Sequence, residues 1–215
     1  MRGSRLISIL VFAILALSAV GCSLLGSGQD SPVLFAESFD ANPKQMDVYV
    51  KDTGMAGVVN GEFQIQVNEP NYMQWALVNQ AYADTVVEVQ ARKAGGPEDN
   101  LYGVICRYKD AENFYYLVIS SDGYYAIGSI VGGVRSLIGS QMMQRSEAIL
   151  GGTQINHLKA SCTGSTLSLE VNGTLVSSVQ DTSLTDGNAG LLAGAFNDPG
   201  VDIRFDNLLV TRPGQ

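Results

Sequence analysis

Few residues of this chain have the types and spacing that catalysis needs. His157 is the single histidine, and its alternating neighbours are typical of a surface strand. No Gly-x-Ser-x-Gly sequence marks a serine nucleophile, and no lysine follows the paired glycines to bind phosphate. Cleavage of a glycosidic bond needs two flanking carboxylates, whereas residues 88–92 alternate Glu88, Gln90 and Arg92. We therefore predict no catalytic residues.

Amide, carboxylate and guanidinium groups recur at alternate positions, and such groups suit a ligand rich in hydroxyls. The predicted ligand-binding face comprises Gln64, Gln66, Glu88, Gln90 and Arg92, with Arg107 added because it alternates with Cys106. Tyr72 and Trp75 are candidates to stack on a sugar ring. The alternative is a solvated polar face with the aromatics in the core. For Trp75 we favour the core, since it alternates with Met73 and Leu77.

A structural calcium ion is the only cofactor that the residues suggest. Glu37 and Asp40 lie on the first predicted strand and Asp206 on the last. Terminal strands that pair would bring these carboxylates together, and calcium prefers oxygen ligands. The alternative is that they are exposed acids of an acidic chain.

Two cysteines of the predicted domain, Cys106 and Cys162, are candidates for a disulfide. They lie far apart in the sequence, and an exported domain with two cysteines usually oxidises them. The other interpretation is two separate buried thiols. Two cysteines and one distant histidine do not make a zinc site.

Strands must position all of these residues. Apolar and polar residues alternate in runs from residue 33 onward, as in Phe63-Gln64-Ile65 and Val87-Glu88-Val89. This period of two predicts strands with one buried face. Asn60-Gly61, Asp122-Gly123 and Asn172-Gly173 predict hairpin turns, and residues 102–128 predict a three-strand meander. Only residues 140–150 could form a helical turn. The predicted fold is all-β, a two-sheet antiparallel sandwich.

Four segments carry a resemblance to a known superfamily. Residues 102–127, 155–176, 187–194 and 205–210 resemble the concanavalin A-like jelly rolls of lectins and glucanases, closest to 3-keto-disaccharide hydrolase-like and laminin-G-like domains. The likeness covers most of residues 33–211 and implies a jelly roll. Glucanases of this superfamily carry a Glu-x-Asp-x-Glu motif on one central strand, which this chain lacks. The resemblance therefore does not imply glucanase activity.

The N-terminal segment has the three parts of a secretory signal. Two arginines precede an apolar stretch from Leu6 to Leu17, and small residues precede Cys22. The stretch is too short to span a membrane, which takes about 20 residues. The pattern resembles a bacterial lipoprotein signal, which implies that Cys22 is acylated, with palmitate among the acyl groups. We predict a signal peptide at 1–21, a flexible tether at 22–32 and the sandwich at 33–211.

The charge of the chain limits its partners. The formal net charge is −8. Removal of residues 1–21 takes away two arginines and makes the net charge more negative. An acidic chain repels phosphate backbones, so we expect no nucleic acid. The expected partners are a membrane, through the N-terminal lipid, and a carbohydrate or other extracellular ligand.

These observations predict a non-catalytic, lipid-anchored sandwich that binds carbohydrate on the extracytoplasmic side of a bacterial envelope. One alternative is a hydrolase of disaccharides or 3-keto-glycosides. Another is a structural or adhesion module that binds no small ligand. The expected membrane is the plasma membrane or the outer membrane.

Overall fold

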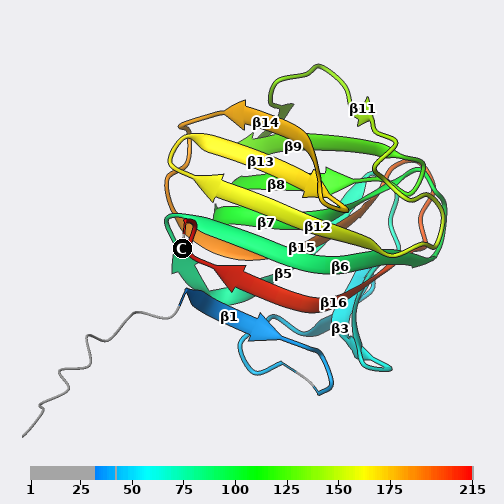
Figure 1. The fold of residues 1–215 in the computed structure, drawn as a ribbon. Helices are drawn as coiled ribbons and strands as arrows, with labels where there is room; N and C mark the ends of the chain where they lie inside the picture. The colour runs from blue at the N-terminus through cyan, green and yellow to red at the C-terminus, as the bar shows by residue number, and fades with distance from the viewer. Residues whose placement is uncertain (1–31, 42, 215) are drawn as a thin grey trace, which may run out of the picture. The chain divides into compact units, whose positions relative to one another are not determined.

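The computed structural model describes residues 32–41 and 43–214, which form two antiparallel sheets (Figure 1). The first sheet contains, in spatial order, β14 (Thr174–Gln180), β13 (Thr166–Val171), β12 (Asn156–Thr163), β6 (Thr85–Gly95), β16 (Val201–Thr211), β4 (Glu62–Val67), β3 (Gly54–Val59) and β2 (Tyr49–Lys51), with β1 (Val33–Glu37) also paired to β16. The second contains β10 (Val134–Leu137), β9 (Tyr124–Val131), β8 (Asn113–Ile119), β7 (Asn100–Asp110), β15 (Gly187–Ala195) and β5 (Tyr72–Tyr82), with β11 (Gln144–Arg145) paired to β9. The predicted signal peptide, Cys22 and the tether up to residue 31 lie outside the described residues.

The alternating residues build the main core between the two sheets. Phe63 and Ile65 of β4 and Val89 of β6 are fully buried, and they face Tyr102 and Val104 of β7 in one cluster. Polar residues between them point out of the first sheet. The sandwich predicted from the period of two is confirmed. Within residues 32–41 and 43–214, no helix is long and apolar enough to cross a membrane.

Local turn chemistry fixes the hairpins. Asn60-Gly61 and Asn172-Gly173 both take positive φ at each residue, with φ of 55° and 80° in the first pair, as a type I′ turn requires. Gly123 alone has positive φ in the third predicted turn. The predicted meander is confirmed as β7, β8 and β9, which pair in sequence. The predicted helical turn at 140–150 is wrong, because this segment is a loop that contains β11.

The cores bury many tyrosine rings, which gives a pH prediction. Burial raises the pKa of Tyr49 and Tyr102 to about 12, and it raises the pKa of four further tyrosines, Tyr82, Tyr108, Tyr115 and Tyr116. Because the pKa is higher in the folded chain than in the unfolded chain, ionisation of these tyrosines destabilises the fold. Their contribution to the free energy of unfolding is complete below the unfolded pKa of 10.0 and is lost as pH rises through about 12. We expect tyrosinate absorbance to develop at higher pH in the folded chain than in urea. Coincident titration curves would contradict this.

Candidate functional site

The outer face of the second sheet is apolar and strongly curved. Strands β10 and β5 are its opposite edges, five strand spacings apart, which is about 24 Å in a flat sheet. Yet Arg135 Nη2 on β10 lies 2.6 Å from Met73 Sδ on β5. Two side chains could not reach each other across the full width of a flat sheet. The face is therefore concave, and the two edges meet above it.

A second apolar cluster fills this concave face. Its buried members are Leu77, Leu101, Ile105, Phe114, Tyr116, Val118, Ala126 and Leu192. Glycine makes this packing feasible, because a Cβ on Gly128 of β9 would lie 2.3 Å from the ring of Tyr116. Trp75, half-buried, packs its ring 5.4 Å from Phe114 and 6.0 Å from Tyr108. Trp75 therefore packs against apolar neighbours, but in the outer cluster and not in the core between the sheets. Its stacking role stays a prediction.

The concave face opens into a pocket at one end. Its volume is about 310 Å³, and it is lined by Asp99, Ser120, Asp122, Tyr124, Met142, Met143 and Phe196. Met143 and Phe196 also pack against the outer apolar cluster, so the pocket continues that face. Carboxylate oxygens accept hydrogen bonds, a hydroxyl donates or accepts, and aromatic rings offer flat apolar surfaces. This combination suits a polyhydroxylated ring.

A buried polar network holds the pocket in place. Asn100, fully buried at the start of β7, donates from Nδ2 to the Pro97 carbonyl (2.7 Å) and to Ser121 Oγ (3.0 Å). Its Oδ1 accepts a hydrogen bond from the Ser121 amide (3.1 Å). Ser120 Oγ lies 2.5 Å from Asp122 Oδ1. Buried networks whose hydrogen bonds are all satisfied are rigid. This network therefore fixes the backbone that carries the pocket side chains.

The predicted ligand-binding residues are divided between the two sheets. Gln64, Gln66, Glu88, Gln90 and Arg92 lie on the outer face of the first sheet. Tyr72, 43% exposed, and Trp75 belong to the second sheet. The predicted combination of polar groups with these aromatics is therefore not present as one surface.

The polar side chains of the first sheet already pair with one another. Arg92 contacts Glu62 through two hydrogen bonds of 2.9 and 2.6 Å, and Gln64 Nε2 donates to Asp202 (2.8 Å). Glu88 pairs with Lys159 at 3.2 Å and lies 3.6 Å from His157. The hollow beside Gln90 has a volume of only about 30 Å³, far below the usual 300 Å³ of a ligand pocket. A ligand role for this face stays a prediction.

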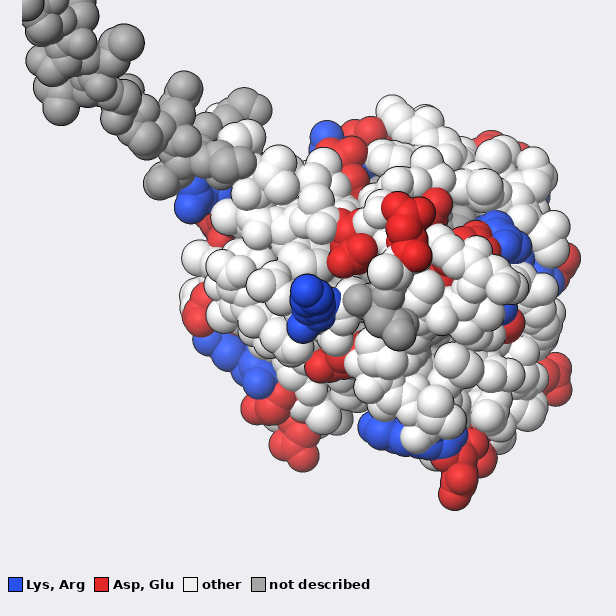
Figure 2. Space-filling model, turned by 90° about the horizontal axis from the view of Figure 1, so that it is seen from below, with Lys and Arg blue, Asp and Glu red and all other residues white. Residues whose placement is uncertain are grey.

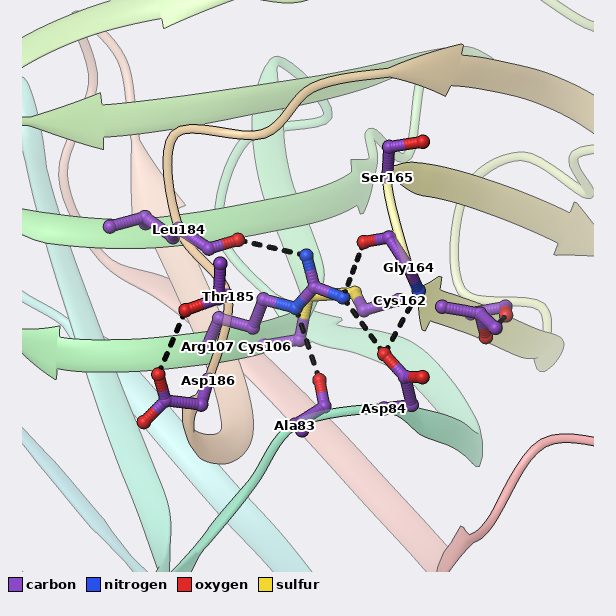
Figure 3. Close-up of polar contacts among 12 residues, drawn as sticks. Ala83, Asp84, Cys106, Arg107, Cys162, Gly164, Ser165, Leu184, Thr185 and Asp186 are labelled. Carbon is purple, nitrogen blue, oxygen red and sulfur yellow. Dashed lines mark hydrogen bonds and ion pairs between the residues drawn. A yellow bond between two sulfur atoms is a disulfide. The ribbon is translucent and has the colours of Figure 1, made fainter.

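Arg107 is not on the polar face, which corrects the prediction from alternation. Its φ of 52° and the irregular register after Cys106 break the period of two. The guanidinium is buried and donates to the carbonyls of Ala83, Gly164 and Leu184 and to Asp84 (Figure 3). It joins three loops of the sandwich.

Beside Arg107, the predicted disulfide is confirmed. Cys106 of β7 is bonded to Cys162 of β12, with Cα atoms 6.7 Å apart (Figure 3). The two strands belong to different sheets. The bond therefore crosses the sandwich.

The predicted calcium ligands have local partners. As expected, the first strand β1 pairs with the last strand β16. Glu37 accepts a hydrogen bond from the amide of Phe39 (3.1 Å), Asp40 from the hydroxyl of Ser38, and Asp206 from the amide of Asn207. In the part of the chain that the structure describes, no group of three acidic, cysteine or histidine side chains could hold a metal. The calcium site stays a prediction without geometric support.

Charged side chains are dispersed over the face that Figure 2 shows. Figure 2 shows Lys and Arg on one face as small separate groups, with Asp and Glu nearby. Many form ion pairs, such as Lys109 with Asp186 at 2.5 Å. The face in this view carries no continuous basic surface.

Sequence reasoning missed most of the pocket. It named Asp122 only as a turn residue, and Asp99, Ser120, Met142, Met143 and Phe196 were not singled out. The sequence does hold one signal, because the turn at Asp122-Gly123 must lie at the same end of the meander as the start of strand 102–108. Nothing in the sequence places Phe196 at that end.

The comparisons with known proteins show a fold. No family model and no curated protein matches the sequence. Among solved structures, the carbohydrate-binding module CBM66 from Bacillus subtilis has a TM-score of 0.55 at 16% identity, over 82% of this chain and 94% of its own. A putative glycosyl hydrolase from Parabacteroides distasonis has a TM-score of 0.56 at 14% identity, over 83% and 99%. A β-glucanase from Bacillus licheniformis has a TM-score of 0.59 at 11% identity, over 86% and 100%. With its two antiparallel sheets and these neighbours, the chain has the concanavalin A-like jelly-roll fold that its sequence resemblance implies.

Proposed function

We propose that this protein is a lipid-anchored, extracytoplasmic module that binds carbohydrate in the pocket at the end of the concave face. The observation that carries the proposal is the lining of that pocket, with Asp99, Ser120 and Asp122 beside Tyr124 and Phe196. Neighbours of the same fold include a carbohydrate-binding module and glycoside hydrolases, which supports the ligand class.

Each group in the pocket has a role in this proposal. Asp122 and Asp99 accept hydrogen bonds from sugar hydroxyls, and Ser120 fixes the orientation of Asp122 through their 2.5 Å contact. Tyr124, 37% exposed, stacks its ring against the sugar from the rim. Phe196 and Met143 provide an apolar floor. Two larger hollows beside β1 have no aromatic side chain except Phe35, which belongs to the main core.

The test is a glycan array followed by isothermal titration with the glycans that bind. Tyr124→Ala is expected to weaken binding at least tenfold, which corresponds to about 1.4 kcal/mol. The matched control is Gln90→Ala, on the polar face of the first sheet, which should leave the affinity unchanged. Weakening by Gln90→Ala alone would move the site to that face. No binding across a broad array would refute the carbohydrate proposal and favour the adhesion module.

A second candidate function is glycoside hydrolysis, because two carboxylates, Asp99 and Asp122, line one pocket. Glycosidases need such a pair, one acting as acid and the other as base or nucleophile. Release of reducing sugar from disaccharides, abolished by Asp122→Asn, would establish this activity. Binding without turnover would support the non-catalytic module.

The anchor gives a separate prediction. Cys22→Ser removes the thiol that the lipoprotein signal presents for acylation. We expect the variant to leave the membrane fraction and to lose label from a radioactive fatty acid, because a chain without acyl groups has no comparable membrane affinity. A variant that still fractionates with membranes and still carries the label would contradict the lipoprotein interpretation.

A further inference from the structure

We infer that the pocket accepts only the end of a glycan chain, because Arg135 and Met73 close the concave face beyond it. This inference rests on the proposed carbohydrate function and narrows its ligand class. The specificity-determining residue is Arg135 of β10, which is not part of the pocket itself.

The closure is visible in the contacts across the face. Arg135 reaches from one edge strand of the sheet to Met73 on the other, with Nη2 2.6 Å from Sδ. Its guanidinium carbon also lies 5.9 Å from the centre of the Tyr116 ring on the central strand β8. A guanidinium at this distance is attracted to the ring. The guanidinium therefore contacts both the ring of Tyr116 and Met73 on the far edge of the sheet.

Burial of the residues beneath shows that side chains fill the concave face. Ile105, Phe114 and Leu192, on three strands of the concave face, are 0% exposed, and Tyr116 is 3% exposed. A cleft that receives the interior of a polysaccharide presents its floor to solvent when empty. Here the floor is packed and covered, so an extended glycan has no path along the sheet.

The open part of the face is then a short pocket. Its volume of about 310 Å³ is at the lower end of the range for small-ligand sites, about 300–1,000 Å³. Met143 and Phe196 lie between the pocket and the buried outer cluster, since both line the pocket and pack on that cluster. Such a site fits a terminal sugar or a short oligosaccharide, and the rest of the glycan would extend into solvent past Tyr124.

The closure can be measured without any ligand. Trp75 is the only tryptophan of the chain, and it packs on Phe114 in the covered cluster. Arg135→Ala is expected to increase acrylamide quenching of its fluorescence at least twofold and to shift the emission to longer wavelength. The control is Arg145→Ala, whose side chain is 65% exposed on β11. Unchanged quenching in a folded Arg135→Ala variant would show that Arg135 does not close the face.

The ligand class is tested on an array of matched oligosaccharides that display the same sugar either at the chain end or within the chain. We expect only chains with the free end to bind, with affinity changing less than threefold from disaccharide to hexasaccharide. Binding of internal sugars, or affinity that rises more than tenfold with length, would refute the inference while leaving the carbohydrate function intact. Absence of binding to every glycan would refute both.

Discussion

Replacement of Arg107 by methionine is expected to lower the free energy of unfolding by about 1–3 kcal/mol, because a buried guanidinium that donates to four acceptors is lost. The Arg107 side chain is 2% exposed. It donates to the carbonyls of Leu184 (2.8 Å), Gly164 (2.7 Å) and Ala83 (3.1 Å), and to Asp84 (3.1 Å). Methionine fills a similar volume but donates nothing, so these acceptors lose their partner.

The location of these acceptors explains the effect. Ala83 and Asp84 follow β5, Gly164 lies in the turn after β12, and Leu184 precedes β15. One guanidinium therefore ties together loops that belong to both sheets (Figure 3). Leu184 is buried, and a buried acceptor left without a donor costs about 1–3 kcal/mol. Ala83, Asp84 and Gly164 are exposed, so water can replace the donor there. Methionine is no more strained than arginine at the φ of 52°, so backbone strain does not contribute to the difference.

Urea unfolding measures this prediction. Arg145→Met is the control, because Arg145 and its partner Glu147 are 65% and 90% exposed, and exposed pairs contribute about 0–1 kcal/mol. Arg107→Lys should lie between the two, since lysine keeps the charge but cannot reach four acceptors with a planar fork. A loss below 1 kcal/mol for Arg107→Met would contradict the proposed role.

Arg107 also shows where sequence reasoning ends. Alternation places the residue after buried Cys106 on the solvent side, which is valid for a regular strand. Here the register shifts between Cys106 and Asp110, and a bulge of this kind redirects a side chain. The backbone φ that causes it is a property of the folded chain. Hydrophobic periodicity predicted the strand correctly, but it carries no information about the bulge.

The candidate site could not be predicted from the sequence, for a related reason. Alternation correctly predicts which residues of β4 and β6 face outward, because it depends only on near neighbours in the chain. The pocket instead combines Asp99, the turn at Asp122 and the end of β15 at Phe196. Their meeting depends on sheet order and on curvature. The three-strand meander of residues 102–128 is predicted correctly, but the residues that its outer face contacts on other strands could not be identified.

Loss of the disulfide should also be strongly destabilising. Cys106 and Cys162 are each 1% exposed and join β7 of one sheet to β12 of the other. The bond closes a loop with a sequence separation of 56 residues, which the chain-entropy model values at roughly 4 kcal/mol. The pair Cys106→Ala and Cys162→Ala is therefore expected to lower the free energy of unfolding by about 2–5 kcal/mol.

Two measurements check the bond and its effect. Peptide mapping of the unfolded, unreduced chain should recover residues 106 and 162 in one disulfide-linked peptide and without alkylation. Urea unfolding should then give a lower midpoint for the alanine pair than for the oxidised chain. Two alkylated peptides would refute the bond, and equal midpoints would refute its contribution. A Ser161→Ala variant, altered at a polar side chain on the outer face of β12, controls for effects of substitution on this strand.

The disulfide and Arg107 should not act independently. Arg107 follows Cys106 directly, and its acceptor Gly164 lies two residues beyond Cys162. Without the disulfide, β7 and β12 lose their covalent link, and the hydrogen bond from Arg107 to Gly164 becomes a remaining tie between them. Residues in one network commonly couple by about 0.5–3 kcal/mol. We therefore expect Arg107→Met in the alanine-pair background to destabilise the fold by a different amount than in the oxidised chain. Strict additivity in this double-mutant cycle would show that the disulfide and Arg107 stabilise the fold independently.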